Sequence, residues 1–288
     1  MAFVPLLPVK TSLAVGADEA QANIVASIKR GYPRLHHLPE FAKVKWDAPL
    51  ALAAGGPSIK GFIDEIKAFP GPVMAVGSAH DWLIDQGIVP RYALVCDADA
   101  NIMASYLQKP HPLTTYLVAT QCHESVFEAL KHHAICMWHC ISSEKDPWLD
   151  ELEPGWQGVG GGCTAGLRAI NTGIVLGYRN MHLFGYDSCL GVNDAVHAYD
   201  LRDKESEAAG LGLEKIFDIS VGRKGPGSKV YRCAGYHLAQ AQNFEEFLRT
   251  YHRLLKPTFY GDGLLRDVYE MVKENVAEAE EVKEAQAA

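Results

Sequence analysis

Residues 50–59 read Leu-Ala-Leu-Ala-Ala-Gly-Gly-Pro-Ser-Ile, an apolar run that ends in two glycines, a proline and a serine just before a helical pattern. Glycine allows a sharp turn and a close approach of another group, because it has no Cβ. Ser58 is a good N-cap, and the amides at the start of a helix carry partial positive charge. A strand, a glycine turn and a helix N-terminus together predict an anion site, most often for phosphate. The same residues also suit a tight turn without a ligand, so both interpretations stay open.

From residue 50 onward, short apolar runs alternate with segments of helical periodicity. The predicted strands are Leu50–Ala54, Val73–Val76, Tyr92–Cys96, Tyr116–Ala119, Ala134–Trp138 and Met181–Phe184. The predicted helices between them are Ile59–Ala68, Ala79–Gln86, Asn101–Gln108, Glu124–Lys131 and Thr164–Leu176. Strands that are nearly continuous in apolar residues and alternate with helices indicate a parallel sheet covered on both faces. We therefore predict an α/β, doubly wound, Rossmann-like fold with a mostly parallel sheet.

The chain divides into four predicted segments. They are an N-terminal arm at 1–45 that packs on the core, a Rossmann-like nucleotide-binding core at 46–200, a loop or lid at 201–234, and C-terminal helices at 235–288. Polar, glycine-rich sequence such as that of residues 187–232 is typical of binding loops and lids. A basic cluster from Arg223 to Arg232 suits an anionic substrate, or simply a solvated loop.

Composition narrows the class of protein. Of the 288 residues, 48% are apolar and 22% are charged, as in ordinary globular proteins. No apolar run reaches the ~20 residues that span a membrane. The formal net charge of −8 gives no general nucleic-acid-binding surface. The seven cysteines are an odd number in apolar contexts, which predicts buried thiols, and prolines interrupt residues 1–16, which read poorly as a signal peptide. We expect a cytoplasmic chain.

Ligands of an open parallel sheet bind beyond the carboxyl ends of its strands. Small and polar residues follow the predicted strands, and a second glycine turn with a Thr cap opens the predicted helix 164–176. That second turn suits an anion or nucleotide, or close packing of helix on sheet. The candidates outside the first turn are Gly77, Ser78, Asp97, Gly161, Gly162, Thr164 and Asp187. Six strand ends in register would gather them into one site.

Two side chains are candidates for chemistry. Asp97, with Asp99 close behind it, suits a magnesium ion that bridges phosphates, a ribose hydroxyl, or the cap of the next helix. We favour Asp97 as the carboxylate that faces the ligand and Asp99 as the cap. His197 follows Asp187 across a glycine-containing loop, and a histidine near a carboxylate can act as general acid or base. We place His197 near the rim of the sheet, together with His80, His123 and His139, and a structural role stays open for each.

Several motifs in one order resemble those of a known family. They are Ala54-Gly-Gly-Pro-Ser-Ile, Gly87-Ile-Val-Pro-Arg-Tyr with Asp97, Gly161-Gly-Cys-Thr-Ala, Leu183-Phe-Gly-Tyr-Asp-Ser and His197-Ala-Tyr. They resemble the MptE-like family, formerly domain of unknown function 115. That family includes archaeal 6-hydroxymethylpterin pyrophosphokinases and the catalytic core of motility-associated flagellin glycosylation factors, which is similar to bacterial sialyltransferases that use CMP-sugars. The resemblance covers residues 50–200, and Arg91 departs from the acid usual in the family.

The resemblance implies roles by position. Phosphate would be contacted by Gly55, Gly56, Pro57 and Ser58, the nucleotide or its metal by Asp97, and the nucleotide pocket would be completed by Gly161, Gly162 and Thr164. Asp187 and His197 would lie at the reacting end.

Three functions stay open. The one we prefer is a glycosyltransferase with a nucleotide-sugar donor resembling a CMP-sugar. The second is an ATP-dependent pyrophosphokinase of the 6-hydroxymethylpterin type, which needs Mg²⁺. The third is a nucleotide-binding protein without catalysis, because a fold does not fix a function. Assembly into a homo-oligomer also stays open.

Overall fold

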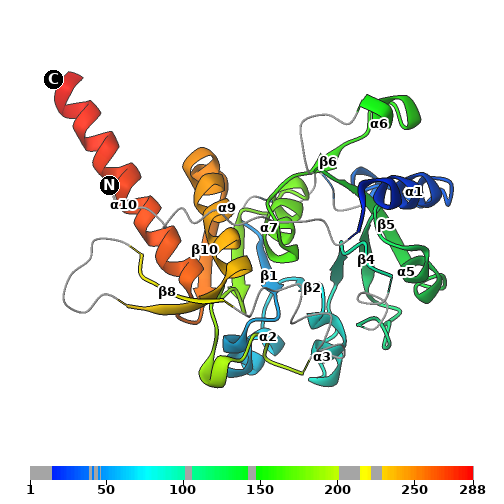
Figure 1. Ribbon diagram of the computed structural model, residues 1–288, viewed down its shortest axis with the longest axis horizontal. Coiled ribbons are helices and arrows are strands. Elements are labelled where there is room, and N and C mark those ends of the chain that lie inside the picture. Colours follow the sequence, from blue (N-terminus) through cyan, green and yellow to red (C-terminus); the bar gives the residue numbers. More distant parts are fainter. Residues whose placement is uncertain are drawn as a thin grey trace.

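The computed structural model describes residues 15–38, 41, 45, 47–100, 106–141, 147–200, 215–221 and 229–287. An eight-stranded sheet forms its centre, in the order β10-β7-β1-β2-β3-β4-β5-β6, and its paired strands are parallel (Figure 1). The strands are β1 (Pro49–Ala53), β2 (Val73–Val76), β3 (Tyr92–Val95), β4 (Thr115–Ala119), β5 (Ala134–Cys140), β6 (Gly158–Val159), β7 (Asn180–Phe184) and β10 (Lys256–Tyr260). The predicted doubly wound α/β fold is confirmed.

Helices cover this sheet. They are α1 (Ala17–Ile28), α2 (Ile63–Lys67), α3 (Ala79–Asp85), α5 (Glu124–Ala129), α6 (Pro147–Leu152), α7 (Ala165–Val175), α9 (Gly235–Tyr251) and α10 (Leu264–Ala287), with short 3₁₀ helices η1 (Leu35–His37), η2 (Pro57–Phe62), η3 (Val192–Asp194) and η4 (His252–Leu254). Figure 1 shows α9 and α10 at the β10 end of the sheet, and α1 and α5 at the β4–β5 end. Among the described residues, no helix is both long and apolar enough to cross a membrane.

The central strands are buried on both faces, which explains their continuous apolar runs. Neighbouring residues of β1 point to opposite faces, yet Ala51 and Leu52 are both fully buried. Helix α7 packs closely on this part of the sheet through Gly173, where a Cβ would lie 2.7 Å from Met181 Cε. Small residues in β1 and α7 therefore let the helix approach the sheet.

Several predictions of local structure were wrong, and two strands were not predicted. Strand β6 is only two residues long, and the edge strand β10 contains Pro257 and is not buried, so neither has the apolar run that identifies a central strand. The predicted helix 59–68 splits into η2 and α2, and Gly56 precedes η2, so Ser58 is not its N-cap. Cys163 is exposed rather than buried.

The predicted loop or lid at 201–234 contains a two-stranded antiparallel sheet of β8 (Ile216–Ile219) and β9 (Tyr231–Ala234). Residues 201–214 and 222–228, which include Arg223 and Lys224 of the basic cluster, lie outside the described residues. So do residues 101–105 of the predicted helix 101–108, and residues 106–108 are not helical.

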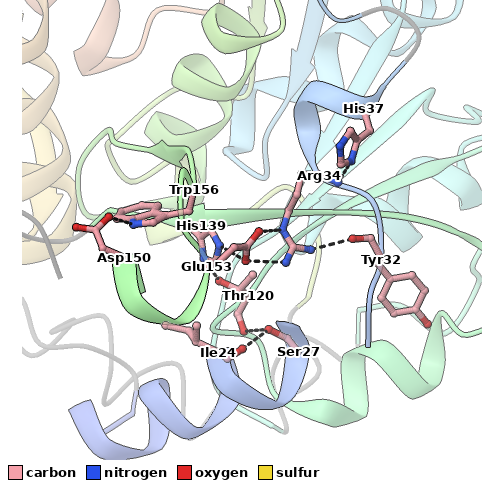
Figure 2. Close-up of polar contacts among 10 residues, drawn as sticks. All are labelled: Ile24, Ser27, Tyr32, Arg34, His37, Thr120, His139, Asp150, Glu153 and Trp156. Carbon is pink, nitrogen blue, oxygen red and sulfur yellow. Dashed lines mark hydrogen bonds and ion pairs between the residues drawn. The ribbon is translucent and has the colours of Figure 1, made fainter. Parts of the chain in front are cut away.

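A charged network fastens the N-terminal arm to the carboxyl ends of β4 and β5 (Figure 2). Arg34 donates from Nε and Nη2 to the two carboxylate oxygens of Glu153, both at 2.7 Å. Glu153 also bonds His139 Nε2 at 3.0 Å, and His139 Nδ1 bonds Thr120 Oγ1 at 2.9 Å. Ser27 of α1 donates to the backbone oxygen of Thr120 at 2.8 Å. These contacts join α1, η1 and α6 to one corner of the sheet.

We expect Glu153→Gln to lower the free energy of unfolding by roughly 1–3 kcal/mol near pH 7, because it removes the charge from bonds to Arg34 and His139. Burial alone would raise the pKa of Glu153, but the hydrogen bonds from these two residues outweigh burial and lower it. A carboxyl with a lowered folded pKa stabilises the fold above its unfolded pKa and loses that effect as the pH falls through the folded value. Urea unfolding should therefore show the deficit near pH 7 and none in acid.

Glu128→Gln is the matched control. It breaks an ion pair with Arg30 in which Glu128 is 56% exposed, so its cost should stay below ~1 kcal/mol. An equal deficit for Glu153→Gln at neutral and acidic pH would contradict the electrostatic account.

Candidate functional site

The loops after β1, β2 and β7 meet where the strand order reverses. Strand β2 pairs with one side of β1, and the later strand β7 returns to its other side. Because all these strands are parallel, their carboxyl ends lie at one edge of the sheet. Such a switch point is the usual ligand site of doubly wound folds.

The glycine turn after β1 is packed against the protein's own groups. A Cβ on Gly56 would lie 2.4 Å from the backbone oxygen of Gly185 and 2.5 Å from Asp187 Oδ2. The amide of Gly56 donates to Gly185 O at 3.1 Å, Ser58 N to Asp187 Oδ2 at 2.8 Å, and Ile59 N to Gly56 O at 3.2 Å. The close approach predicted from the glycines is real, but the partners are in the chain itself. The amides of Gly56 and Ser58 in the predicted phosphate turn, and that of Ile59 just after it, are thus already bonded.

Asp187 is held firmly at the end of β7. It is only 6% exposed, and burial raises its pKa, while its hydrogen bonds from Ser58 and the charge of Lys229 oppose that rise. Its backbone oxygen accepts a hydrogen bond from Leu264 N at 2.7 Å. The next residue, Ser188, has a φ of 49° and donates to His237 O at 2.9 Å. The carboxylate of Asp187 therefore fixes the β1 turn to the β7 turn.

A strap formed by residues 195–200 crosses the turns after β1 and β2. Ala198 N donates to Gly55 O at 2.9 Å, and a Cβ on Gly55 would lie 2.5 Å from His197 Cδ2. The hydroxyls of Tyr199 and Ser78 bond at 2.8 Å, and the Tyr199 ring lies 5.6 Å from that of Trp82. Burial lowers the pKa of His197 to about 4, so its imidazole is neutral near pH 7. The strap brings His197 to the switch point, where it lies beside Gly55. The next residue, Gly56, lies against Asp187.

The turn after β2 also touches the start of α7. A Cβ on Gly77, which has a φ of 54°, would lie 3.6 Å from Ala165 Cβ. Thr164 is the N-cap of α7, as predicted, and its Oγ1 accepts from Leu167 N at 3.4 Å. Gly161 and Gly162 before it have φ values of 114° and 82°, a region that favours glycine. The two predicted glycine turns at 77–78 and 161–164 therefore lie at the same edge.

Asp97 lies half-buried at the end of β3. Its Oδ1 accepts a hydrogen bond from Asp99 N at 3.0 Å, and burial raises its pKa. It is thus Asp97, the residue predicted to face the ligand, that closes this turn. Within the described ranges, no group of three or more His, Cys, Asp or Glu side chains is arranged to hold a metal ion.

The other three histidines placed near the rim have structural partners. His80 is fully buried and bonds Asp81 Oδ1 at 2.9 Å and the Tyr116 hydroxyl at 3.1 Å. His123 is the N-cap of α5, accepting from Ser125 N. His139 belongs to the network of Figure 2. These contacts favour the structural role for each of the three.

Sequence reasoning missed two residues of this edge. Tyr199 entered the sequence analysis only as the last residue of the His-Ala-Tyr motif, and its position in the sequence did not indicate that its hydroxyl bonds Ser78. Arg168, one turn into α7, donates from Nη1 to Ile141 O at 2.7 Å and Val159 O at 2.9 Å. A basic residue soon after a glycine turn was the available signal.

Comparison with known proteins identifies the family to which the chain is similar. The family described as 6-hydroxymethylpterin diphosphokinase MptE-like matches residues 21–193. None of the curated proteins matches the chain. The solved structure of the MAf glycosyltransferase from Magnetospirillum magneticum AMB-1 is similar with a TM-score of 0.63 at 17% identity, covering 88% of this chain and 37% of that one. An uncharacterized B. cereus protein gives a TM-score of 0.22 at 9% identity, covering 88% and 60%, which is too low to indicate a shared fold.

The likeness to the Magnetospirillum enzyme, at 17% identity, shows a shared fold, and the aligned part covers 37% of that longer chain. The family match extends further than half of this chain, from 21 to 193. It includes strands β1 to β7 and the turns after them. The chain therefore belongs to the MptE-like family.

Proposed function

We propose that this chain is a transferase that binds a nucleotide donor at the switch-point edge and passes a group from it to an acceptor hydroxyl. The observation that carries the proposal is the proximity of Gly77 to Ala165, since it sets the start of α7 beside the β2 turn. At that turn Ser78 bonds Tyr199, whose strap also carries His197. Amides at a helix start suit a phosphate, and a neutral imidazole suits proton transfer.

In this proposal the donor phosphate lies between the β2 turn and the start of α7. The amides of Gly56 and Ser58 in the Gly55–Ser58 turn are already bonded, so that turn would shape the site and support the strap. Asp187 would be a positioning residue at the reacting end, because its carboxylate fixes the β1 turn through Ser58.

We favour glycosyl transfer from a nucleotide-sugar donor resembling a CMP-sugar. His197 would take the proton of the acceptor hydroxyl while that oxygen bonds the anomeric carbon of the sugar. The bond from this carbon to the donor phosphate breaks, and the nucleotide leaves with the electron pair. The amides at the start of α7 would stabilise the charge on the leaving phosphate. The fold shared with a glycosyltransferase supports this choice.

The pKa of His197, about 4, describes the protein without a donor. A nearby anionic phosphate favours the protonated imidazole and so raises this pKa toward the working pH. Donor binding would thus make His197 a stronger base at the moment when the acceptor needs one.

The second candidate is transfer of diphosphate from ATP to a hydroxymethyl group, and the description of the matching family favours it. Mg²⁺ often binds through one or two carboxylates plus the phosphates of the substrate. Asp97, half-buried at the β3 end, fits such a role. The donor phosphates would then supply the other ligands of the Mg²⁺ ion.

We expect His197→Ala to reduce turnover of the donor by roughly tenfold or more, because it removes the proton acceptor. Steady-state assays with a nucleotide-sugar, and separately with ATP and Mg²⁺, measure it. His123→Asn is the matched control, since His123 lies at the same edge but only caps α5, and Asn also caps helices. Unchanged turnover in His197→Ala would remove His197 from the mechanism.

Thermal shifts with CMP, CDP, UDP, GDP, ADP and ATP, each with and without Mg²⁺, rank the donors. A ligand at a hundred times its Kd stabilises the native state by about 2.7 kcal/mol. For glycosyl transfer we expect the largest shift from CMP, without a metal requirement. A shift confined to ATP with Mg²⁺ would instead establish the diphosphokinase, and nucleotide binding without turnover of any donor would indicate a protein that binds but does not catalyse.

A further inference from the structure

The indole of Trp82, in α3, lies over the β2 turn. Trp82 follows Ser78, the N-cap of α3, by four residues, so the two side chains share one face of the helix. A helical side chain leans toward the preceding turn, which brings the indole back over Ser78. The Tyr199 hydroxyl, which bonds Ser78 at 2.8 Å, belongs to a ring that lies 5.6 Å from the Trp82 ring at an inclination of 31°. Trp82 therefore lies at the turn where the donor phosphate is proposed to bind.

The fold uses this indole only in part. Trp82 is half-buried, so some of its surface faces solvent. Tryptophan N–H groups usually find a hydrogen-bond acceptor when they are buried. Trp138 Nε1 donates to Leu117 O at 3.0 Å, and Trp156 Nε1 donates to Asp150 Oδ1 at 2.9 Å. Across the described part of the chain, nothing accepts a hydrogen bond from Trp82 Nε1. Trp82 thus offers a ligand both aromatic surface and an N–H donor.

Tyr199 connects Trp82 to the proposed general base. Its ring lies 5.6 Å from the Trp82 ring and also 5.6 Å from the His197 ring. His197 lies at the β1 turn, against Gly55, whereas Trp82 lies over the β2 turn. A phosphate at the β2 turn therefore has the imidazole toward β1 and the indole toward α3. This order gives the two halves of a donor different neighbours.

We propose that the base of the bound nucleotide stacks on Trp82. The inference rests on the proposed function, which it deepens: it assigns the nucleoside half of the donor to the Trp82 side and the transferred group to the His197 side. Every nucleobase has a π-face, and packing a base on an aromatic ring raises affinity by roughly tenfold or more. Tyr199 supports the indole before a ligand arrives, so little order has to be created on binding.

The test compares two probes, CMP and ribose 5-phosphate, by calorimetry on the full chain. Both carry a single phosphate on a ribose, and only CMP carries a base. Trp82→Leu removes the aromatic ring, and we expect it to weaken CMP binding by roughly tenfold or more while the affinity for ribose 5-phosphate stays unchanged. Trp82→Phe keeps an aromatic face and should bind CMP with an affinity between those of the wild type and Trp82→Leu.

Trp156 provides a matched control. It is also half-buried and also contacts a ring, that of His139 at 5.3 Å, but at the corner of the sheet shown in Figure 2. Trp156→Leu should leave the affinity for both probes unchanged. Equal CMP binding by wild type and Trp82→Leu would overturn the proposal, as would a loss as large in Trp156→Leu. An equal loss of ribose 5-phosphate binding in Trp82→Leu would also overturn it, because the ring would then act on the ribose or the phosphate.

A second measurement decides the proposal even if Trp82→Leu fails to fold. CMP should quench part of the tryptophan fluorescence of the wild type, and this quench should vanish in Trp82→Phe and persist in Trp156→Phe. A quench that remains in Trp82→Phe would overturn the stacking.

The stacking and the proposed function can fail separately. A wild type that binds ribose 5-phosphate as tightly as CMP would end the stacking and leave the phosphate position standing. A wild type that binds neither probe would end both. CMP binding that depends on Trp82, without turnover of any donor, would keep the stacking and end the proposed transferase.

Discussion

The hydrogen bond from Ser58 N to Asp187 Oδ2 joins two strands that lie side by side but far apart in the sequence. Strands β1 and β7 pair in parallel on either side of the reversal in strand order, and this bond ties their following turns together at 2.8 Å. Gly56 and Gly185 make the approach possible, since a Cβ on either would collide with the backbone of the other turn. The strap, the β2 turn and α7 all pack around this junction. Its carboxylate takes the place beside the helix start that an external anion takes in many nucleotide-binding folds.

The sheet could be predicted from the sequence wherever a strand is buried on both faces. Strand β2 was predicted with its correct bounds, and β1, β3, β4, β5 and β7 within two residues, because a continuous apolar run is the signal of a central parallel strand. Strands β6 and β10 lie at the two edges, where one side has no neighbouring strand and the burial that creates the signal is missing. The split of the helix after β1 into η2 and α2 also escaped prediction.

The candidate site was predicted in its position more than in its contacts. Parallel strands bring their carboxyl ends together whatever the loops contain, so Gly77, Asp97, Thr164 and Asp187 were expected at one edge and lie there. Which group faces which could not be read from the sequence, because the partners lie far apart along the chain; Ser58 and Asp187, for example, are separated by 129 residues. Residue type was also ambiguous: a glycine admits a ligand and a neighbouring side chain equally well, and here Gly55 contacts His197.

The bond between Tyr199 and Ser78 joins two uncharged hydroxyls, and each can donate or accept. A phosphate oxygen arriving at that point would exchange one hydroxyl–hydroxyl bond for two bonds that both donate to a negative charge, and such bonds are the stronger kind. An anion at that point would therefore favour separation of the strap from the β2 turn over the hydroxyl–hydroxyl bond that now joins them.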